Sequence, residues 1–190
     1  DYLNKRFDQP VYLNIDVMDY NARIDGKDST FSDFLNDSSL YKSTFMKYAA
    51  KTDLFFAGHF YATGAPYLFT RKDVKSPDFK ISVVADVSCD IDGPVATTIK
   101  PSTIDNPIYG YNRNTEKEDD FMSNDIIAVM AVDNLPCELP KDSSEDFGEH
   151  LIKHIIPIIN SDNKIIEGAT ICKNGDLTKN YEYLRDYVNS

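Results

Sequence analysis

The chain of 190 residues has the length of one ordinary domain, and its 42% hydrophobic and 12% aromatic content argues against a disordered protein. Its formal net charge of −11 argues against nucleic acids and anionic membranes as partners, because both attract clustered Lys and Arg. No apolar stretch reaches the length of a membrane span, and the polar start does not resemble a secretory signal. The three cysteines show no metal-type spacing and no disulfide framework, so we predict a cytoplasmic protein.

The first half of the chain alternates between short apolar segments and polar segments, each long enough for one structural element. These segments predict a strand at residues 11–15, a surface loop at 21–32, an amphipathic helix at 39–51, a strand at 53–58 and a short helix at 70–75. Pro77 ends the short helix, because proline disfavours the helical conformation of the residue before it.

The second half predicts a sheet that continues and is followed by helices. The expected elements are a strand at 81–87, an edge strand at 107–111, an exposed hairpin tip at 112–120, a strand at 126–132, a long helix at 142–159, a linker at 161–164 and a final amphipathic helix at 178–188. Asp142, Ser143 and Ser144 are the candidate N-caps of the long helix.

This order of elements predicts an α/β fold, a Rossmann-like parallel sheet flanked by helices. We assign residues 1–160 to the later part of such a domain and residues 161–190 to a return segment whose helix packs on a different domain. The eight glycines never form the G-x-G-x-x-G or P-loop pattern that binds phosphate. We therefore expect the phosphate-binding turn of a nucleotide domain to lie upstream of residue 1, in a longer protein.

Residues 80–94 and 125–140 share a pattern that indicates a ligand site. Each begins as an apolar, β-branched run and ends abruptly in polar residues. These are Asp86, Ser88, Cys89, Asp90 and Asp92 in the first and Asp133 with Asn134 in the second. Ligands of open α/β sheets bind outside the carboxyl ends of the strands, so these two ends are expected side by side over one crevice. The alternative is that both are ordinary turns, since Ser, Asp, Asn and Gly are common turn residues.

Other candidates for chemistry are weaker. Cys89 is not favoured as a nucleophile, because neighbouring carboxylates would raise the pKa of its thiol. Asp86, Asp90 and Asp92 lack the ligand spacing of a calcium loop. No metal site is predicted.

The histidines also allow two interpretations. His150 and His154 have the spacing of zinc ligands, but no third ligand is evident, and a helix-surface pair explains them better. His59 follows the predicted strand at 53–58, where it either titrates near the site or forms a hydrogen bond within a loop; both interpretations stay open.

Several stretches of the chain resemble a known family when they are read together. They are DVSCDIDGP, TTIKPSTIDNP, AVDNLPCELPKDSSEDFGEHL and GATICKNGDLTKNYEYL, and they are similar to the lysine-ketoglutarate reductase/saccharopine dehydrogenase family of the alanine dehydrogenase and transhydrogenase group. The resemblance covers most of the chain, from about residue 53 to about residue 187. It implies two α/β domains, with a dinucleotide, NAD or NADP, and an amino-acid or keto-acid substrate meeting in the cleft between them.

The resemblance also implies roles for individual residues. The residues expected to bind the cofactor are Phe60, Tyr61, Val87, Val132, Asp133, Asn134 and Leu135. The residues expected to face the substrate are Ser88, Cys89 and Asp90. The Lys and His that move protons in this family lie in its amino-terminal domain, so no catalytic residue is predicted here and the chain alone is expected to be inactive.

Two alternative functions remain at this point. One is an alanine dehydrogenase-like enzyme that uses pyruvate and ammonia, and the other is a non-catalytic α/β module for binding or assembly. The choice between NAD and NADP, and self-association into a homo-oligomer, also stay open.

Overall fold

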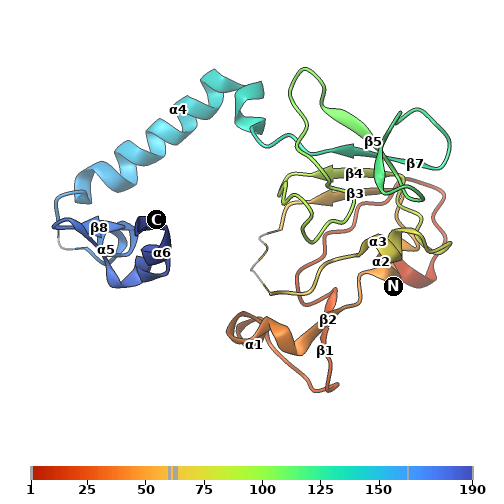
Figure 1. The fold of residues 1–190 in the computed structure, drawn as a ribbon, viewed down its shortest axis with the longest axis horizontal. Coiled ribbons are helices and arrows are strands. Elements are labelled where there is room, and N and C mark those ends of the chain that lie inside the picture. Colours follow the sequence, from red (N-terminus) through yellow and green to blue (C-terminus); the bar gives the residue numbers. More distant parts are fainter. Residues whose placement is uncertain (1, 60, 62–63, 162, 190) are drawn as a thin grey trace. The chain divides into compact units, whose positions relative to one another are not determined.

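The computed structural model describes residues 2–59, 61, 64–161 and 163–189. They form two compact units, Asp1–Leu135 and Pro136–Ser190 (Figure 1). The first unit contains the main sheet, and the second contains the long helix α4 (Pro140–His150). The predicted boundary between residues 160 and 161 stays a prediction, since no partner domain is present to test where the return segment packs.

The first unit is built on a five-stranded sheet in the order β3-β4-β7-β5-β6. Its parallel part consists of β3 (Leu54–Ala57), β4 (Val83–Asp86) and β7 (Ile126–Met130). The remaining strands, β5 (Ile108–Asn112) and β6 (Lys117–Asp119), are antiparallel to their neighbours. Short helices flank the sheet, so the predicted α/β fold with parallel strands is confirmed (Figure 1).

The core lies where these strands pack against aromatic side chains from the flanking segments. Val84 of β4 faces Val129 of β7 in the register, and both side chains are fully buried. Phe45 packs its ring between Phe55 and Phe69, with ring centroids 4.8 and 5.7 Å away. Full burial of each such side chain contributes about 1.5–3 kcal/mol, which explains why these apolar runs predict strands correctly.

The helix α3 (Arg71–Val74) begins and ends as the sequence predicts. The Thr70 hydroxyl accepts a hydrogen bond from the Asp73 backbone N–H, and the Asp73 carboxylate accepts one from the Thr70 N–H. This capping box satisfies amide groups that the first turn of a helix otherwise leaves unpaired.

The amino-terminal segment differs most from the prediction. Residues 11–15 form no strand, and the predicted loop at 21–32 contains β1 (Asn21–Arg23) and the start of α1 (Phe31–Asn36). A capping box between Thr30 and Asp33 begins α1, and the prediction overlooked this signal.

The predicted helix at 39–51 is also wrong over most of its length. The segment forms a 3-10 turn (Ser38–Leu40), then β2 (Tyr41–Ser43) paired with β1, and only then α2 (Met46–Ala49). The Ser43 hydroxyl donates to the Leu68 carbonyl at 2.6 Å and accepts from the Phe45 N–H at 3.1 Å. A serine that bonds backbone groups in this way competes with the helical pattern.

The strand predicted at the sheet edge is in fact internal. β5 lies between β7 and β6, because the predicted hairpin at 112–120 supplies β6 as the edge. At Gly110 a Cβ atom would come within 2.5 Å of the Asp119 carbonyl oxygen and 2.6 Å of Ile126 Cγ2. Only glycine permits this close approach of the strands.

In the second unit the predicted long helix is confirmed, but it begins earlier than predicted. α4 (Pro140–His150) continues through a π-helical turn (Leu151–Ile155) into a 3-10 turn (Ile156–Ile158). Leu139 precedes the first turn without a side-chain cap, and Pro140 occupies the first helical position, where its missing N–H costs nothing. The three predicted N-cap residues therefore lie inside the helix.

The rest of the second unit is only partly as predicted. The predicted linker runs into α5 (Lys164–Ala169), and the final helix is a kinked 3-10 segment (Lys179–Leu184) followed by α6 (Arg185–Val188). A hairpin of β8 (Cys172–Lys173) and β9 (Asp176–Leu177) was not predicted, although Asn174-Gly175 between them is a strong hairpin signal. Both turn residues have positive φ, 56° and 84°.

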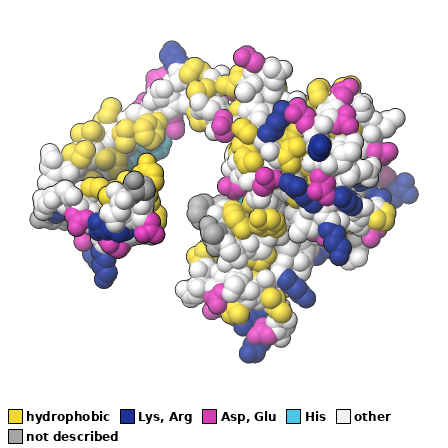
Figure 2. Space-filling model, viewed as in Figure 1, with side chains coloured by type: hydrophobic (Ala, Val, Ile, Leu, Met, Phe, Trp, Pro, Cys, Tyr) yellow, Lys and Arg dark blue, Asp and Glu magenta, His cyan; other side chains and the backbone are white. Residues whose placement is uncertain are grey.

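No described residue of Pro136–Ser190 is buried. Phe147, Ile152 and Ile156 are 65%, 69% and 58% exposed, and Figure 2 shows apolar side chains gathered along this helical segment. Among the residues that the structure describes, no helix is long and apolar enough to span a bilayer.

Candidate functional site

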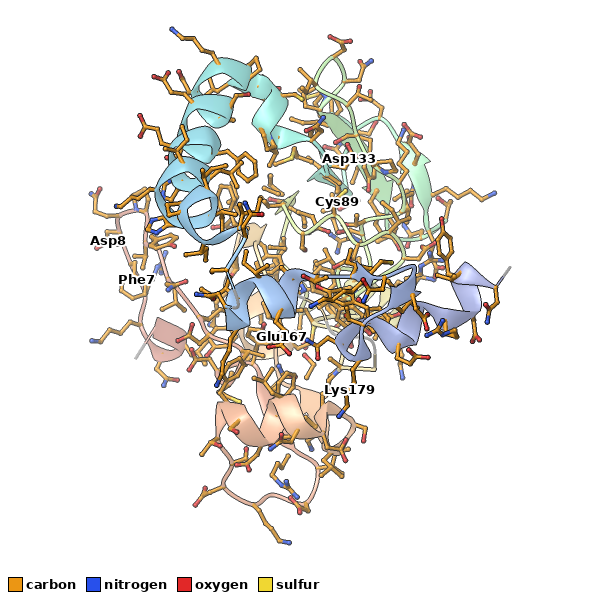
Figure 3. The ribbon with its side chains drawn as sticks, turned by 90° about the vertical axis from the view of Figure 1, so that its left-hand side faces the viewer. Phe7, Asp8, Cys89, Asp133, Glu167 and Lys179 are labelled. Atoms are coloured by element: carbon orange, nitrogen blue, oxygen red, sulfur yellow. The ribbon has the colours of Figure 1, made fainter. Side chains whose placement is uncertain are left out.

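The three parallel strands end at one edge of the sheet, and this edge is the candidate site. β4 pairs in parallel with both β3 and β7, so residues 58–59, 87–90 and 131–134 leave the sheet at the same edge. The Cys89 thiol lies 3.1 Å from the Ala131 carbonyl oxygen, which joins the segment after β4 to the segment after β7. Figure 3 shows Cys89 and Asp133 at this edge. The predicted side-by-side arrangement is confirmed.

The buried carboxylate of Asp86 organises the segment after β4. Its Oδ1 accepts hydrogen bonds from the Ser88 hydroxyl at 2.5 Å and the Cys89 N–H at 3.0 Å. Its Oδ2 accepts from the Thr98 hydroxyl at 2.6 Å. Because a buried carboxylate needs several donors, Asp86 determines the shape of this turn. From the sequence, Asp86 was the first of several polar residues at the end of the run, and its role in shaping the turn was not predicted.

Cys89 is held in the left-handed backbone region, with φ 52°, and its side chain is half-buried. Burial raises the pKa of its thiol, and the nearby carboxylates of Asp86, Asp133 and Asp90 raise it further. The predicted direction of this shift is confirmed. The thiol stays protonated and donates to the Ala131 carbonyl, so it is a poor nucleophile.

The polar loop beside β7 was not recognised as part of the site. The Ser102 hydroxyl accepts from the Ala131 N–H at 2.9 Å, while the Ser102 N–H donates to the Ala131 carbonyl at 2.8 Å. The Tyr109 hydroxyl donates to the Thr97 carbonyl at 3.0 Å, and burial raises the pKa of Tyr109 to about 12. These contacts fix the carboxyl end of β7, but threonine- and proline-rich sequence predicts only an irregular loop.

The side chains of the three predicted substrate residues differ in whether they already form hydrogen bonds within the protein. Ser88 is occupied by its bond to Asp86, so it supports the turn. Cys89 is turned toward β7. Asp90 is half-buried beside them. Of these three residues, Asp90 is the one whose side chain shows no hydrogen bond or ion pair with any described residue.

The predicted cofactor residues occupy the same edge. Val87 is 49% exposed at the end of β4, while Asp133 and Asn134 are exposed beyond β7 and Leu135 is half-buried. Val132 is 4% exposed and forms a parallel bridge with Ser102. Phe60 lies outside the described residues. Whether any of them binds a ligand stays a prediction.

Tyr61 and His59 lie at the carboxyl end of β3. The Tyr61 hydroxyl donates to the Ala65 carbonyl at 3.2 Å, and its ring meets Tyr67 edge-on at 5.8 Å. Both ring nitrogens of His59 are buried without a hydrogen-bond partner among the described residues. Burial lowers the pKa of His59, and the charges of Asp86 and Asp90 partly oppose that shift.

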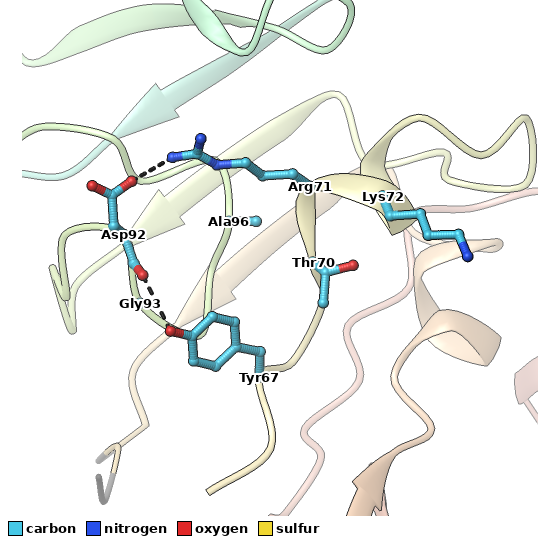
Figure 4. Close-up of a pocket in the computed structure, with 7 residues that line it drawn as sticks. All are labelled: Tyr67, Thr70, Arg71, Lys72, Asp92, Gly93 and Ala96. Carbon is cyan, nitrogen blue, oxygen red and sulfur yellow. Dashed lines mark hydrogen bonds and ion pairs between the residues drawn. The ribbon is translucent and has the colours of Figure 1, made fainter. Parts of the chain in front are cut away.

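Two pockets flank this edge of the first unit. The larger, about 570 Å³, lies between β3 and the amino-terminal segment and includes His59 and Tyr61 among its lining residues. The smaller, about 300 Å³, contains Arg71, which forms an ion pair with Asp92 (Figure 4). Neither pocket is lined by residues 87–90 or 132–135, so an enclosed crevice over those two segments stays a prediction.

Among the described residues, no cluster of three or more His, Cys, Asp or Glu is placed to hold a metal ion. His150 and His154 lie on the second unit with ring centroids 5.9 Å apart, and His150 Nδ1 is 2.8 Å from the Asp146 carbonyl oxygen.

A mostly parallel central sheet flanked by helices places the chain in the α/β class with a Rossmann-like domain. A family model described as alanine dehydrogenase/PNT, C-terminal domain, matches residues 11–181, and the chain belongs to this family of oxidoreductase enzymes. The predicted resemblance is thereby confirmed.

Individual proteins similar to this chain support the same family assignment. The chain is 26% identical over 155 residues to the mitochondrial alpha-aminoadipic semialdehyde synthase of Bos taurus, a match that covers 67% of this chain and 17% of that protein. It is 29% identical over 128 residues to the alpha-aminoadipic semialdehyde synthase of Arabidopsis thaliana, covering 63% and 12%. It is 30% identical over 119 residues to the NAD(+), L-lysine-forming saccharopine dehydrogenase of Schizosaccharomyces pombe, covering 60% and 30%. The chain thus spans less than a third of each of these relatives.

Proposed function

We propose that this chain is the later part of the dinucleotide-binding domain of an NAD(P)-dependent amino-acid dehydrogenase of saccharopine dehydrogenase type. The observation that carries the proposal is the parallel pairing of β4 with β7, which brings residues 88–90 and 132–135 to one edge of the sheet. The name of the Schizosaccharomyces pombe relative, which includes NAD(+), supports the cofactor class.

The residues at this edge fit one end of a dinucleotide. Val87 offers an exposed apolar contact, and Asn134 offers an amide that both donates and accepts hydrogen bonds. Val132 is buried, so it would form part of the wall beneath the ligand. Once bound, a nicotinamide dinucleotide supplies the hydride acceptor or donor, and the protein supplies orientation and electrostatics. The glycine-rich phosphate turn is missing from this sequence, so the chain would hold only the end where cofactor and substrate meet.

In this proposal Asp90 binds the substrate, and it lies in the turn whose shape Asp86 determines. A carboxylate at this position attracts the ammonium group of an amino acid. Ser88 and Cys89 would bound the substrate mainly through their backbone, because their side chains bond to Asp86 and Ala131. Tyr61 would flank the cofactor beyond the end of β3, whereas Phe60 lies outside the described residues.

The function is tested by following NAD(P)H absorbance with the longer natural protein that contains this sequence. We expect oxidation of saccharopine, and we expect Asp90→Asn to lower kcat/KM by about tenfold or more, since it removes a charge from the substrate side. Turnover of pyruvate and ammonia in place of lysine and 2-oxoglutarate would favour the alanine dehydrogenase alternative. The 190-residue chain alone should show no turnover, and measurable activity would contradict the assignment as a part-domain.

A non-catalytic binding or assembly module remains the second candidate. The exposed apolar side chains of the second unit favour it, because such surfaces are usually covered by a partner. The charge of −11 supports a protein with no nucleic-acid or membrane partner. We keep the cytoplasm as the proposed location and a homo-oligomer as an open option, although the mammalian relatives are named as mitochondrial.

A further inference from the structure

The turn that carries Asp90, residues 88–93, is strained at two positions. Cys89 and Asp92 both have a left-handed backbone, with φ 52° at each, although neither is glycine. Gly93 closes the turn, and its N–H donates to the Asp90 carbonyl at 3.0 Å. A Cβ atom on Gly93 would lie only 2.7 Å from Asp90 Cβ. Residues other than glycine keep such a conformation only where contacts on several sides impose it, and strain of this kind is concentrated at functional sites.

The first half of this turn is held from inside the protein. The Asp86 carboxylate accepts a hydrogen bond from the Cys89 N–H at 3.0 Å, and the Cys89 thiol donates to the Ala131 carbonyl at 3.1 Å. These contacts end at Cys89, so Asp90 lies between this fixed half of the turn and Asp92. The position of the Asp90 carboxylate therefore also depends on the contacts that fix Asp92.

Asp92 is bound at three of its groups by three other segments. Its N–H donates to the Thr98 carbonyl at 2.9 Å, and its carbonyl accepts from the Tyr67 hydroxyl at 3.4 Å. Its carboxylate pairs with the Arg71 guanidinium at 2.5 Å (Figure 4). Hydrogen bonds between charged groups are about twice as strong as those between neutral groups, so Arg71 makes the strongest of the three contacts.

Arg71 is itself held in place from two sides. It is the first residue of α3, whose start is fixed by the capping box between Thr70 and Asp73. Its guanidinium also contacts the Glu116 carboxylate at 3.4 Å, and Lys75 pairs with the same carboxylate at 2.5 Å. A single exposed ion pair contributes little, whereas several charges in one network hold their geometry better. This network joins α3 and the hairpin tip before β6 to the Asp90 turn.

We propose that Arg71 is a positioning residue, which holds Asp92 and thereby keeps the half-buried carboxylate of Asp90 in the place where it meets the amino-acid substrate. Asp90 would contact the substrate, while Arg71 acts only through the turn. The role in substrate binding rests on the proposed function, whereas the coupling of Arg71 to Asp90 does not. The cofactor residues beyond β7 lie outside the turn, so loss of Arg71 should weaken binding of the substrate and not of the dinucleotide.

The coupling is tested by NMR on the 190-residue chain labelled with ¹⁵N and ¹³C. We expect Arg71→Ala to move the amide and Cα signals of Asp90 and Asp92, because Cα shifts report φ. Arg71→Lys should restore most of the native signals, since it keeps the charge opposite Asp92. Arg23→Ala is the matched control, because it removes an arginine pair of the same unit, with Asp25 at 2.7 Å, and should leave the turn unchanged. Circular dichroism establishes that each variant is folded.

The role in substrate binding is tested by kinetics of the longer natural protein that contains this sequence. We expect Arg71→Ala to raise the KM for saccharopine by about tenfold or more and to change the KM for the dinucleotide by less than about twofold. Arg71→Lys should recover most of the loss. When Asp90 is already replaced by Asp90→Ala, adding Arg71→Ala should lower kcat/KM by less than about twofold, because the carboxylate that it positions is gone.

Three results would overturn the proposal. They are Asp90 signals that do not move in folded Arg71→Ala, a KM for the dinucleotide that rises as much as the KM for saccharopine, and a full additional loss when Arg71→Ala is combined with Asp90→Ala. Failure of the proposed function is seen separately, as a wild-type longer protein that does not oxidise saccharopine, and the NMR result would stand without it. A wild-type protein that oxidises saccharopine, with an unchanged KM in Arg71→Ala, would contradict the role of Arg71 alone.

Discussion

The two units of this protein use apolar residues in opposite ways. In the first unit Phe45, Val84 and Val129 are buried in a sheet-centred core. In the second, Phe147, Ile152 and Ile156 lie on helical turns with more than half of each side chain exposed. A parallel sheet buries side chains on both faces as it forms, whereas a helix needs a partner for its apolar stripe. Apolar content therefore predicts burial only where the topology supplies a second layer.

The largest expected effect is on the free energy of unfolding. It compares a buried side chain of the first unit with an exposed side chain of the second. Phe45→Ala removes a buried ring between Phe55 and Phe69 and should lower the free energy of unfolding by about 3–5 kcal/mol. Ile156→Ala, at an exposed position, should change it by less than about 0.5 kcal/mol. Urea unfolding measures both variants. Equal losses would mean that the second unit has a core of its own.

The next effect compares two carboxylates. Asp86→Asn weakens an acceptor of three hydrogen bonds inside the first unit, and we expect a loss of about 2 kcal/mol. Asp176→Asn, on the second unit, alters an exposed ion pair with Arg185 and should cost much less, because solvent screens such pairs. Amide spectra should show Cys89 moving in the first variant. An unperturbed Cys89 amide would argue that Asp86 does not hold the turn.

A third comparison uses the cysteines as probes. Cys89 should react with iodoacetamide at least about tenfold more slowly than Cys137 and Cys172, because burial and nearby carboxylates raise the pKa of its thiol and lower its thiolate fraction. Mass spectrometry of partly alkylated protein at pH 8 gives the three rates. In urea the three rates should converge, and a fast Cys89 in the folded protein would reopen its role as a nucleophile.

The smallest expected effect is on the pH dependence of stability, through His59. Burial lowers the pKa of His59 below its usual 6.5, so protonation favours the unfolded chain. His59 should contribute stability that is fully present above pH 6.5 and is lost as the pH falls through the pKa of the folded state. An NMR titration of folded and urea-unfolded chain measures the two midpoints. A folded midpoint above the unfolded one would show that Asp86 and Asp90 outweigh burial.

Sequence alone was sufficient for features that depend on neighbours along the chain. The apolar runs of β3, β4 and β7 predicted strands correctly, and each of these strands contributes at least one fully or almost fully buried side chain, Ala57, Val84 and Val129 among them. The short helix α3 was also predicted from its local sequence. The polar ends of β4 and β7 then predicted one ligand-binding edge, since parallel strands end on the same side of a sheet.

Tertiary structure decided what depends on contacts between distant residues. Periodicity predicted a helix where β2 pairs with β1, because the bond from Ser43 to Leu68 and the pairing with Asn21–Arg23 cannot be read from local pattern. Likewise the carboxylate of Asp86 became the centre of the turn only when Thr98 came beside it, and His59 became notable only when packing buried both of its nitrogens without partners among the described residues. Local propensity operates over a few residues, while hydrogen bonds and burial depend on which segments the fold brings together.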